Sequence, residues 1–66
     1  MQVMLNGVPA DLADGLTMAD VVHTISTKTS GITVAHNGEV VPRGEWPAVD
    51  LRDGDRLDVL TAVQGG

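Results

Sequence analysis

The chain has 66 residues, of which 42% are hydrophobic, and it contains no cysteine, phenylalanine or tyrosine. A chain of this length forms one small domain with an aliphatic core, too short to enclose a substrate pocket, and the absence of cysteine excludes disulfides, thiolate metal sites and a thiol nucleophile. The formal net charge of −5 argues against binding to nucleic acids or anionic membranes, and it fits either a protein partner with a basic face or simply high solubility.

The N-terminal segment has the pattern of a β-hairpin. Residues 1–5 alternate with the period of a half-buried strand, and residues 8–12 repeat that alternation in the returning strand. Between them stands Asn6-Gly7, a dipeptide that tolerates the positive φ angles of a type I′ turn. Because Pro9 has no amide donor, we expect the returning strand at or near an edge of the sheet.

A helix is predicted from Thr17 onward. Thr17 is a favourable N-cap, and Asp20 stands three residues later, as in a capping box. The helix is expected to lie on the sheet through a stripe of apolar residues at helical spacing, which consists of Met18, Val21, Val22 and Ile25. Lys28 suits the last turn of such a helix, and Gly31 is a plausible stop.

Three more strands are predicted after the helix. Residues 32–36 alternate as a strand, and Asn37-Gly38 gives a second turn into residues 39–41. A further turn at residues 53–55 precedes an alternating strand over residues 57–63. These patterns predict a second hairpin followed by a final strand.

The segment from Val41 to Pro47 is interrupted by two prolines and a glycine. We expect it to be an ordered connection rather than a regular element. Its tryptophan, Trp46, is the largest apolar side chain of the protein, and a lid over one end of the aliphatic core is favoured over a role in stacking on a ligand.

Two glycines follow the last predicted strand, in the sequence Gln64-Gly65-Gly66. Without side chains, such a tail can enter a slot too narrow for any residue with a Cβ, and it reaches roughly 10 Å when extended. The chemistry would then lie at the α-carboxylate of Gly66. The alternative is that the glycines merely fray or are left over from cloning. We therefore divide the chain into a folded domain over residues 1–63 and a flexible tail over residues 64–66.

One helix across a mixed sheet of about four to five strands is an α+β fold of the β-grasp, or ubiquitin-like, type. In order and over essentially the whole chain, the sequence also resembles the thiamine-biosynthesis sulfur carrier family. The segments that carry the resemblance are MLNG, GLTMADVV, AHNGEVVPRGEW and LRDGDRLDVLTAVQGG. One departure is His36, where the family usually has an aliphatic residue. Whether His36 belongs to the core is therefore left undecided by the sequence.

The resemblance implies a sulfur-carrying co-substrate, not an enzyme. In the family, an E1-like adenylating enzyme uses ATP and magnesium to activate the terminal carboxylate. A persulfide from a cysteine desulfurase or rhodanese-like donor then leaves the sulfur as a thiocarboxylate, a C-terminal 1-thioglycine, which thiazole synthase uses to build the thiazole ring. Carried onto this chain, Gly66 bears the sulfur, and Gly65 and Gln64 give access to it. Val63 is a candidate for contact with a partner, and Arg43 either contacts a partner or merely caps the connecting segment.

The other side chains agree with a non-catalytic protein that binds no metal or cofactor. No nucleophile, base and orienting group are recognisable together, and His23 is expected to be a surface histidine because no metal ligand stands at a suitable spacing. No signal peptide or apolar run of roughly 20 residues is present, which points to the cytoplasm.

Two alternative functions stay open. The small subunit of molybdopterin synthase shares the fold and the terminal chemistry, but it usually has a proline pair shortly before the glycines, and residues 61–64 contain none. The other alternative is a ubiquitin-like modifier or interaction module, which forms lysine conjugates or only binds.

Overall fold

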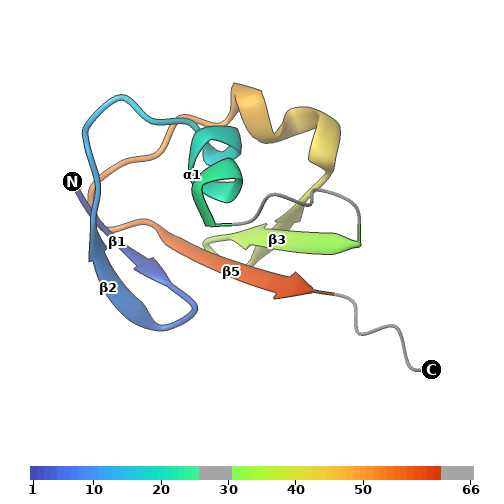
Figure 1. Ribbon diagram of the computed structural model, residues 1–66, viewed down its shortest axis with the longest axis horizontal. Coiled ribbons are helices and arrows are strands. Elements are labelled where there is room, and N and C mark those ends of the chain that lie inside the picture. The colour runs from blue at the N-terminus through green and yellow to red at the C-terminus, as the bar shows by residue number, and fades with distance from the viewer. Residues whose placement is uncertain (26–30, 62–66) are drawn as a thin grey trace.

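A mixed five-stranded sheet carries one α-helix across one of its faces (Figure 1). The computed structural model describes residues 1–25 and 31–61. Its elements are β1 (Gln2–Leu5), β2 (Val8–Asp11), α1 (Met18–Ile25), β3 (Ile32–His36), β4 (Glu39–Val41), the 3-10 helix η1 (Arg43–Ala48) and β5 (Arg56–Thr61). The strand order is β2-β1-β5-β3-β4, with β1 parallel to β5 and the other neighbours antiparallel. The predicted arrangement of one helix on a mixed sheet is confirmed.

Both predicted hairpin turns are present. Asn6 and Gly7 have φ angles of 50° and 81°, and Asn37 and Gly38 have φ angles of 51° and 86°. Positive φ at both central residues is the requirement of a type I′ turn, whose twist matches that of the flanking strands. The first hairpin places Pro9 in β2, which is an edge strand as predicted.

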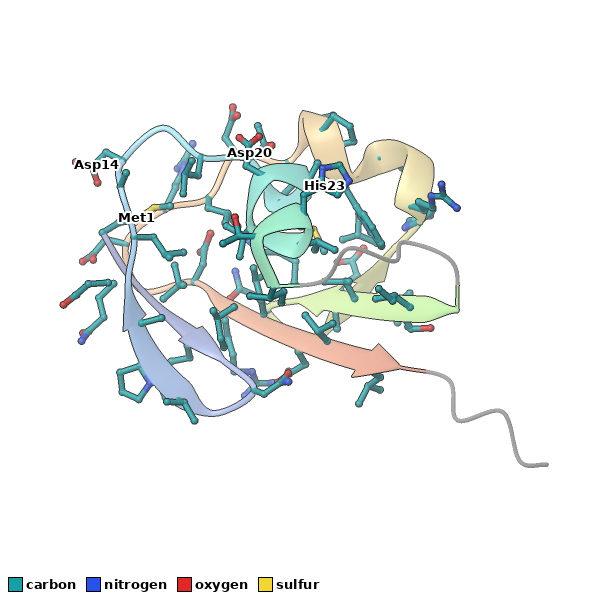
Figure 2. The ribbon with its side chains drawn as sticks, in the orientation of Figure 1. Met1, Asp14, Asp20 and His23 are labelled. Atoms are coloured by element: carbon teal, nitrogen blue, oxygen red, sulfur yellow. The ribbon has the colours of Figure 1, made fainter. Side chains whose placement is uncertain are left out.

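The predicted capping box begins α1. The Thr17 backbone N–H donates to Asp20 Oδ2 at 2.9 Å, and the Asp20 backbone N–H donates to Thr17 Oγ1 at 3.2 Å. The hydrogen bond from the Thr17 backbone, followed by that with the Thr17 side chain, lowers the pKa of Asp20 below its ordinary value. Figure 2 shows Asp20 together with His23 on α1, and His23 is exposed, as expected.

The buried face of α1 differs from the predicted stripe at one position. Its buried residues are Met18, Ala19, Val21 and Val22. Ile25 is 46% exposed, so that its inclusion in the stripe was wrong. It is the last residue of α1, at the margin of the core. Lys28 lies outside the described residues, and Gly31, just ahead of β3, has a φ of 74°.

The segment before Val49 is a regular element, contrary to the prediction of an irregular connection. Residues Arg43–Ala48 form the 3-10 helix η1. Pro42 has a φ of −58°, and its carbonyl accepts a hydrogen bond from the Glu45 N–H at 2.8 Å, an i to i+3 bond that begins the 3-10 turn. A proline in this segment therefore starts a short helix instead of preventing one.

Trp46 closes one end of the core from η1. Its side chain is only 2% exposed, and its Nε1–H donates to the Val41 carbonyl at 2.9 Å. The indole thus packs in the cluster of buried residues with its one polar group satisfied. The prediction of a lid over the core, rather than a ligand-stacking group, is confirmed.

Candidate functional site

The central strand β5 leads toward the C-terminal glycines. It lies between β1 and β3 (Figure 1). It pairs with β3 from Leu57 to Thr61 and with β1 at Arg56 and Leu57. Leu57 is fully buried, and Val59 packs against the core. The strand that precedes the tail is therefore fixed by packing as well as by hydrogen bonds.

Asn6, in the first hairpin turn, binds one edge of β5. Its backbone N–H donates to the Leu57 carbonyl at 2.9 Å. Its side-chain Oδ1 accepts from the Val59 N–H at 2.7 Å, and its Nδ2 donates to the Val59 carbonyl at 3.3 Å. The amide group thus replaces the two backbone groups that a neighbouring strand residue would offer to Val59.

Asn37, in the second hairpin turn, binds the other edge of β5. Its Oδ1 accepts from the Arg56 N–H and its backbone N–H donates to the Arg56 carbonyl, both at 2.8 Å. The sequence predicted the two Asn-Gly turns but not their contacts with β5. The sequence feature that could have indicated these contacts is the asparagine at the first position of both turns, because its side-chain amide carries a donor and an acceptor together.

His36 pairs with a carboxylate at the start of β5. Its Nε2 lies 2.9 Å from Asp55 Oδ2, which also accepts from the Arg52 backbone N–H at 2.9 Å. Asn37 Nδ2 donates to the other carboxylate oxygen at 3.2 Å. The His36 side chain is 25% exposed. His36 is thus accommodated by a polar partner at the margin of the core.

The same contacts control the ionisation of Asp55. Partial burial raises the pKa of this carboxyl, but the hydrogen bonds from His36, from the Arg52 backbone and from the Asn37 amide outweigh burial and hold the pKa below its ordinary value. At neutral pH Asp55 is therefore an anion that only accepts hydrogen bonds. The proton shared between His36 Nε2 and Asp55 Oδ2 is accordingly assigned to His36 Nε2, which is the donor.

Replacing Asp55 by asparagine is expected to destabilise the domain at neutral pH by about 1 kcal/mol, because charge-assisted hydrogen bonds at a partly exposed site are lost. The sign of the pH dependence follows from the lowered pKa. Asp55 contributes stability above its unfolded pKa of about 3.9 and loses that contribution as the pH falls through its folded pKa. Urea unfolding between about pH 7 and about pH 3 should therefore show a smaller acid-induced loss for Asp55→Asn than for the natural protein.

Asp58→Asn is the matched control for this experiment. Arg56 Nε lies 3.3 Å from Asp58 Oδ2. The side chain of Arg56 is 56% exposed and that of Asp58 is 37% exposed. Such exposed pairs contribute about 0–1 kcal/mol. An acid limb that is equally steep in Asp55→Asn and in the natural protein would contradict the role given to Asp55.

The predicted site residues are only partly within the described ranges. Gly66, Gly65, Gln64 and Val63 lie outside them. Arg43 is exposed and is the first residue of η1, a helix that is separate from β5 in the fold. Arg43 therefore belongs to a different element from β5, and it takes no part in the strand pairing of β5.

Two classes of feature are not found in residues 1–25 and 31–61. No group of three or more His, Cys, Asp or Glu side chains there has the spacing of a metal site. Over the same residues, no helix has the length and apolar character needed to cross a membrane.

A mixed sheet with one helix across it and this strand order defines a β-grasp, or ubiquitin-like, domain. The family model described as "ThiS family" matches residues 3–66, and the chain belongs to this family. It is therefore a sulfur carrier of thiamine biosynthesis and not itself a catalyst. The crystal structure of thiamine biosynthesis protein ThiS from Geobacter metallireducens superposes with a TM-score of 0.85, at 29% identity and over 100% of both chains.

Two kinds of curated protein are similar to the chain. The sulfur carrier protein ThiS of Thermus thermophilus is 38% identical over 64 residues, which cover 97% of this chain and 98% of that protein. The thiazole synthase of Magnetococcus marinus is 30% identical over 66 residues, which are 100% of this chain but 20% of that protein. The thiamine family, favoured from the sequence over the molybdopterin synthase small subunit, is thus confirmed.

Proposed function

We propose that the α-carboxylate of Gly66 carries the sulfur as a thiocarboxylate, and that Gly65 and Gln64 give partner enzymes access to it. The observation that carries this proposal is that the family match extends over residues 3–66 and thus includes the terminal glycines. Gln64-Gly65-Gly66 follows shortly after β5, the strand held by Asn6 and Asn37. A rigid domain would present the tail, and the tail would enter the partner.

The carboxylate requires activation before it can accept sulfur. A terminal carboxyl has an unperturbed pKa of about 3.3–3.7, so that at neutral pH it is an anion and a poor electrophile. We assign activation to an E1-like adenylating enzyme that uses ATP and magnesium, and the sulfur to a persulfide on a cysteine desulfurase or rhodanese-like donor. The persulfide sulfur displaces AMP from the acyl-adenylate, and a thiol outside this chain then cleaves the resulting acyl disulfide, supplying two electrons and leaving as a disulfide with the donor. The product is a C-terminal 1-thioglycine. Because the chain has no cysteine, it offers no thiol of its own that would compete for the persulfide.

Thiazole synthase is the proposed acceptor of the sulfur. A carrier-like segment within a protein named thiazole synthase supports this choice, because a tethered carrier meets its acceptor at high effective concentration. We place the reaction in the cytoplasm and retain the division into a domain over residues 1–63 and a tail over residues 64–66. Arg43, exposed on η1, and Val63 are proposed to contact the partners.

Sulfur is expected at Gly66 after incubation with the adenylating enzyme, ATP, magnesium, a persulfide source and a thiol reductant. Intact mass spectrometry would detect the exchange of one oxygen for sulfur, and fragment sequencing would locate it. A chain that lacks Gly65 and Gly66 is the control and should remain unmodified. Sulfur on an internal residue, or equal activation of the shortened chain, would refute the proposal.

A further inference from the structure

One edge of β5 is paired up to Val59, and after Val59 it meets no strand among the residues that the structure describes. On this side β1 ends at Leu5, and its last pairing with β5 is Leu5 with Leu57. The Asn6 side chain then binds both backbone groups of Val59. Figure 1 shows β5 continuing past the turn between β1 and β2. Among residues 1–25 and 31–61, no strand lies beside the last part of β5 on this side.

The backbone of Thr61 faces the open side. Along a strand, the N–H and C=O groups of successive residues point to opposite edges. Leu57 and Val59 direct theirs toward β1 and Asn6, so that Thr61, the next residue in this alternation, directs its N–H and C=O to the same side. Leu60 directs its backbone to β3, where it is in register with Thr33. The last residue of β5 thus presents one donor and one acceptor at an edge that no strand within residues 1–25 and 31–61 covers.

An exposed apolar side chain stands next to these groups. Leu60 is 66% exposed. It projects from the face of the sheet opposite α1, because Leu57 and Val59, in the other phase of the strand's alternation, pack into the core. Unpaired strand edges bind extended segments of other chains through backbone hydrogen bonds, and neighbouring side chains add apolar contact. The edge at Thr61 with Leu60 has both properties.

We propose that thiazole synthase binds this protein by adding an extended segment of its own backbone to β5 at Thr61, and that the same segment covers Leu60. This inference rests on the proposed function. Gly66 follows Thr61 by only five residues, so that a partner that acts at Gly66 also comes within reach of this edge. Thiazole synthase is the choice because a protein of that name contains a segment similar to this whole chain.

In this arrangement Asn6 is a positioning residue. It ends the pairing of β5 at Val59 and thereby determines the first residue at which a foreign strand can add. Strand addition at Thr61 would hold the following residues in an extended direction into the synthase, which reduces the conformational freedom that the tail must lose on binding.

The test uses protein made by total chemical synthesis, which is practical for 66 residues and allows N-methylation of one backbone amide. N-methylation at Thr61 removes the donor and blocks the open edge. The control is N-methylation at Asp11 in the edge strand β2. Its neighbour Leu12 donates to the Met1 carbonyl, so that by the same alternation the Asp11 N–H faces the outer edge, where no described strand lies.

For the N-methyl-Thr61 protein we expect an unchanged melting temperature, unchanged thiocarboxylation by the adenylating enzyme, and a rise of about tenfold in the KM of thiazole synthase with kcat preserved. The N-methyl-Asp11 protein should match the unmodified protein in all four measurements. Leu60→Ser should also raise this KM, whereas Val8→Ser, at a residue that is 62% exposed on β2, should not.

Three results would overturn the inference. An unchanged KM would exclude strand addition, a lower melting temperature would show that the Thr61 N–H is already bonded within the domain, and a loss confined to thiocarboxylation would make the adenylating enzyme the occupant. Failure of the unmodified protein to acquire sulfur at Gly66 would instead refute the proposed function itself, so that the two failures are distinguishable.

Discussion

Val22→Asp is expected to unfold the domain. Val22 is fully buried in the cluster between α1 and the sheet, and a carboxylate there would have no partner for its charge. The penalty is several kcal/mol, which is comparable with a total stability of roughly 3–10 kcal/mol for a chain of this length. Circular dichroism would show loss of the helix, and the fluorescence of Trp46, the single tryptophan, would report its exposure to water.

Ile25→Asp places the same charge on the same helix and serves as the control. Ile25 is 46% exposed, so that the carboxylate can remain in water and the expected loss is about 1 kcal/mol or less. This variant should fold and unfold cooperatively. If Val22→Asp were as stable as Ile25→Asp, the buried face assigned to α1 would be incorrect.

Local chemistry explains why much of the fold was predictable. The Asn-Gly turns need only a dipeptide that accepts positive φ angles, and the capping box needs only Thr17 and Asp20 three residues apart. Pro9 predicts an edge strand because it has no backbone N–H to donate to a neighbouring strand. In each case the residues that decide the structure are close together in the sequence.

The features that were missed depend on partners far away in the sequence. Asn6 and Val59 are 53 residues apart, and His36 and Asp55 are 19 apart. Alternation alone assigned His36 a face of its strand but did not identify the carboxylate beside it. Likewise, helical spacing grouped Ile25 with the buried residues, although the exposure of a residue at a helix end depends on what packs against that end.

The candidate site combines both kinds of information. The sequence alone pointed to Gly66, because a terminal glycine pair after a strand can enter a slot too narrow for any residue with a Cβ. The contacts that hold β5 appeared only in three dimensions, where two turns from different parts of the chain bind opposite edges of one strand. The domain thus fixes the strand up to Thr61, and we propose that flexibility is reserved for the tail.

Gly65→Val is expected to slow the thiocarboxylation of Gly66 strongly while leaving the domain folded. A β-branched side chain in the tail would clash with the walls of a channel shaped for glycine, and the rate of thiocarboxylation should fall by at least about 100-fold, as for a catalytic geometry displaced by about 1 Å. Gly44→Val is the matched control, because a Cβ at Gly44 would meet nothing within 4 Å. Thiocarboxylation followed by mass spectrometry, with thermal unfolding of each variant, separates the two effects. An unchanged rate for Gly65→Val would show that the tail does not enter a narrow channel, and a large fall in its melting temperature would show that Gly65 is packed in the domain.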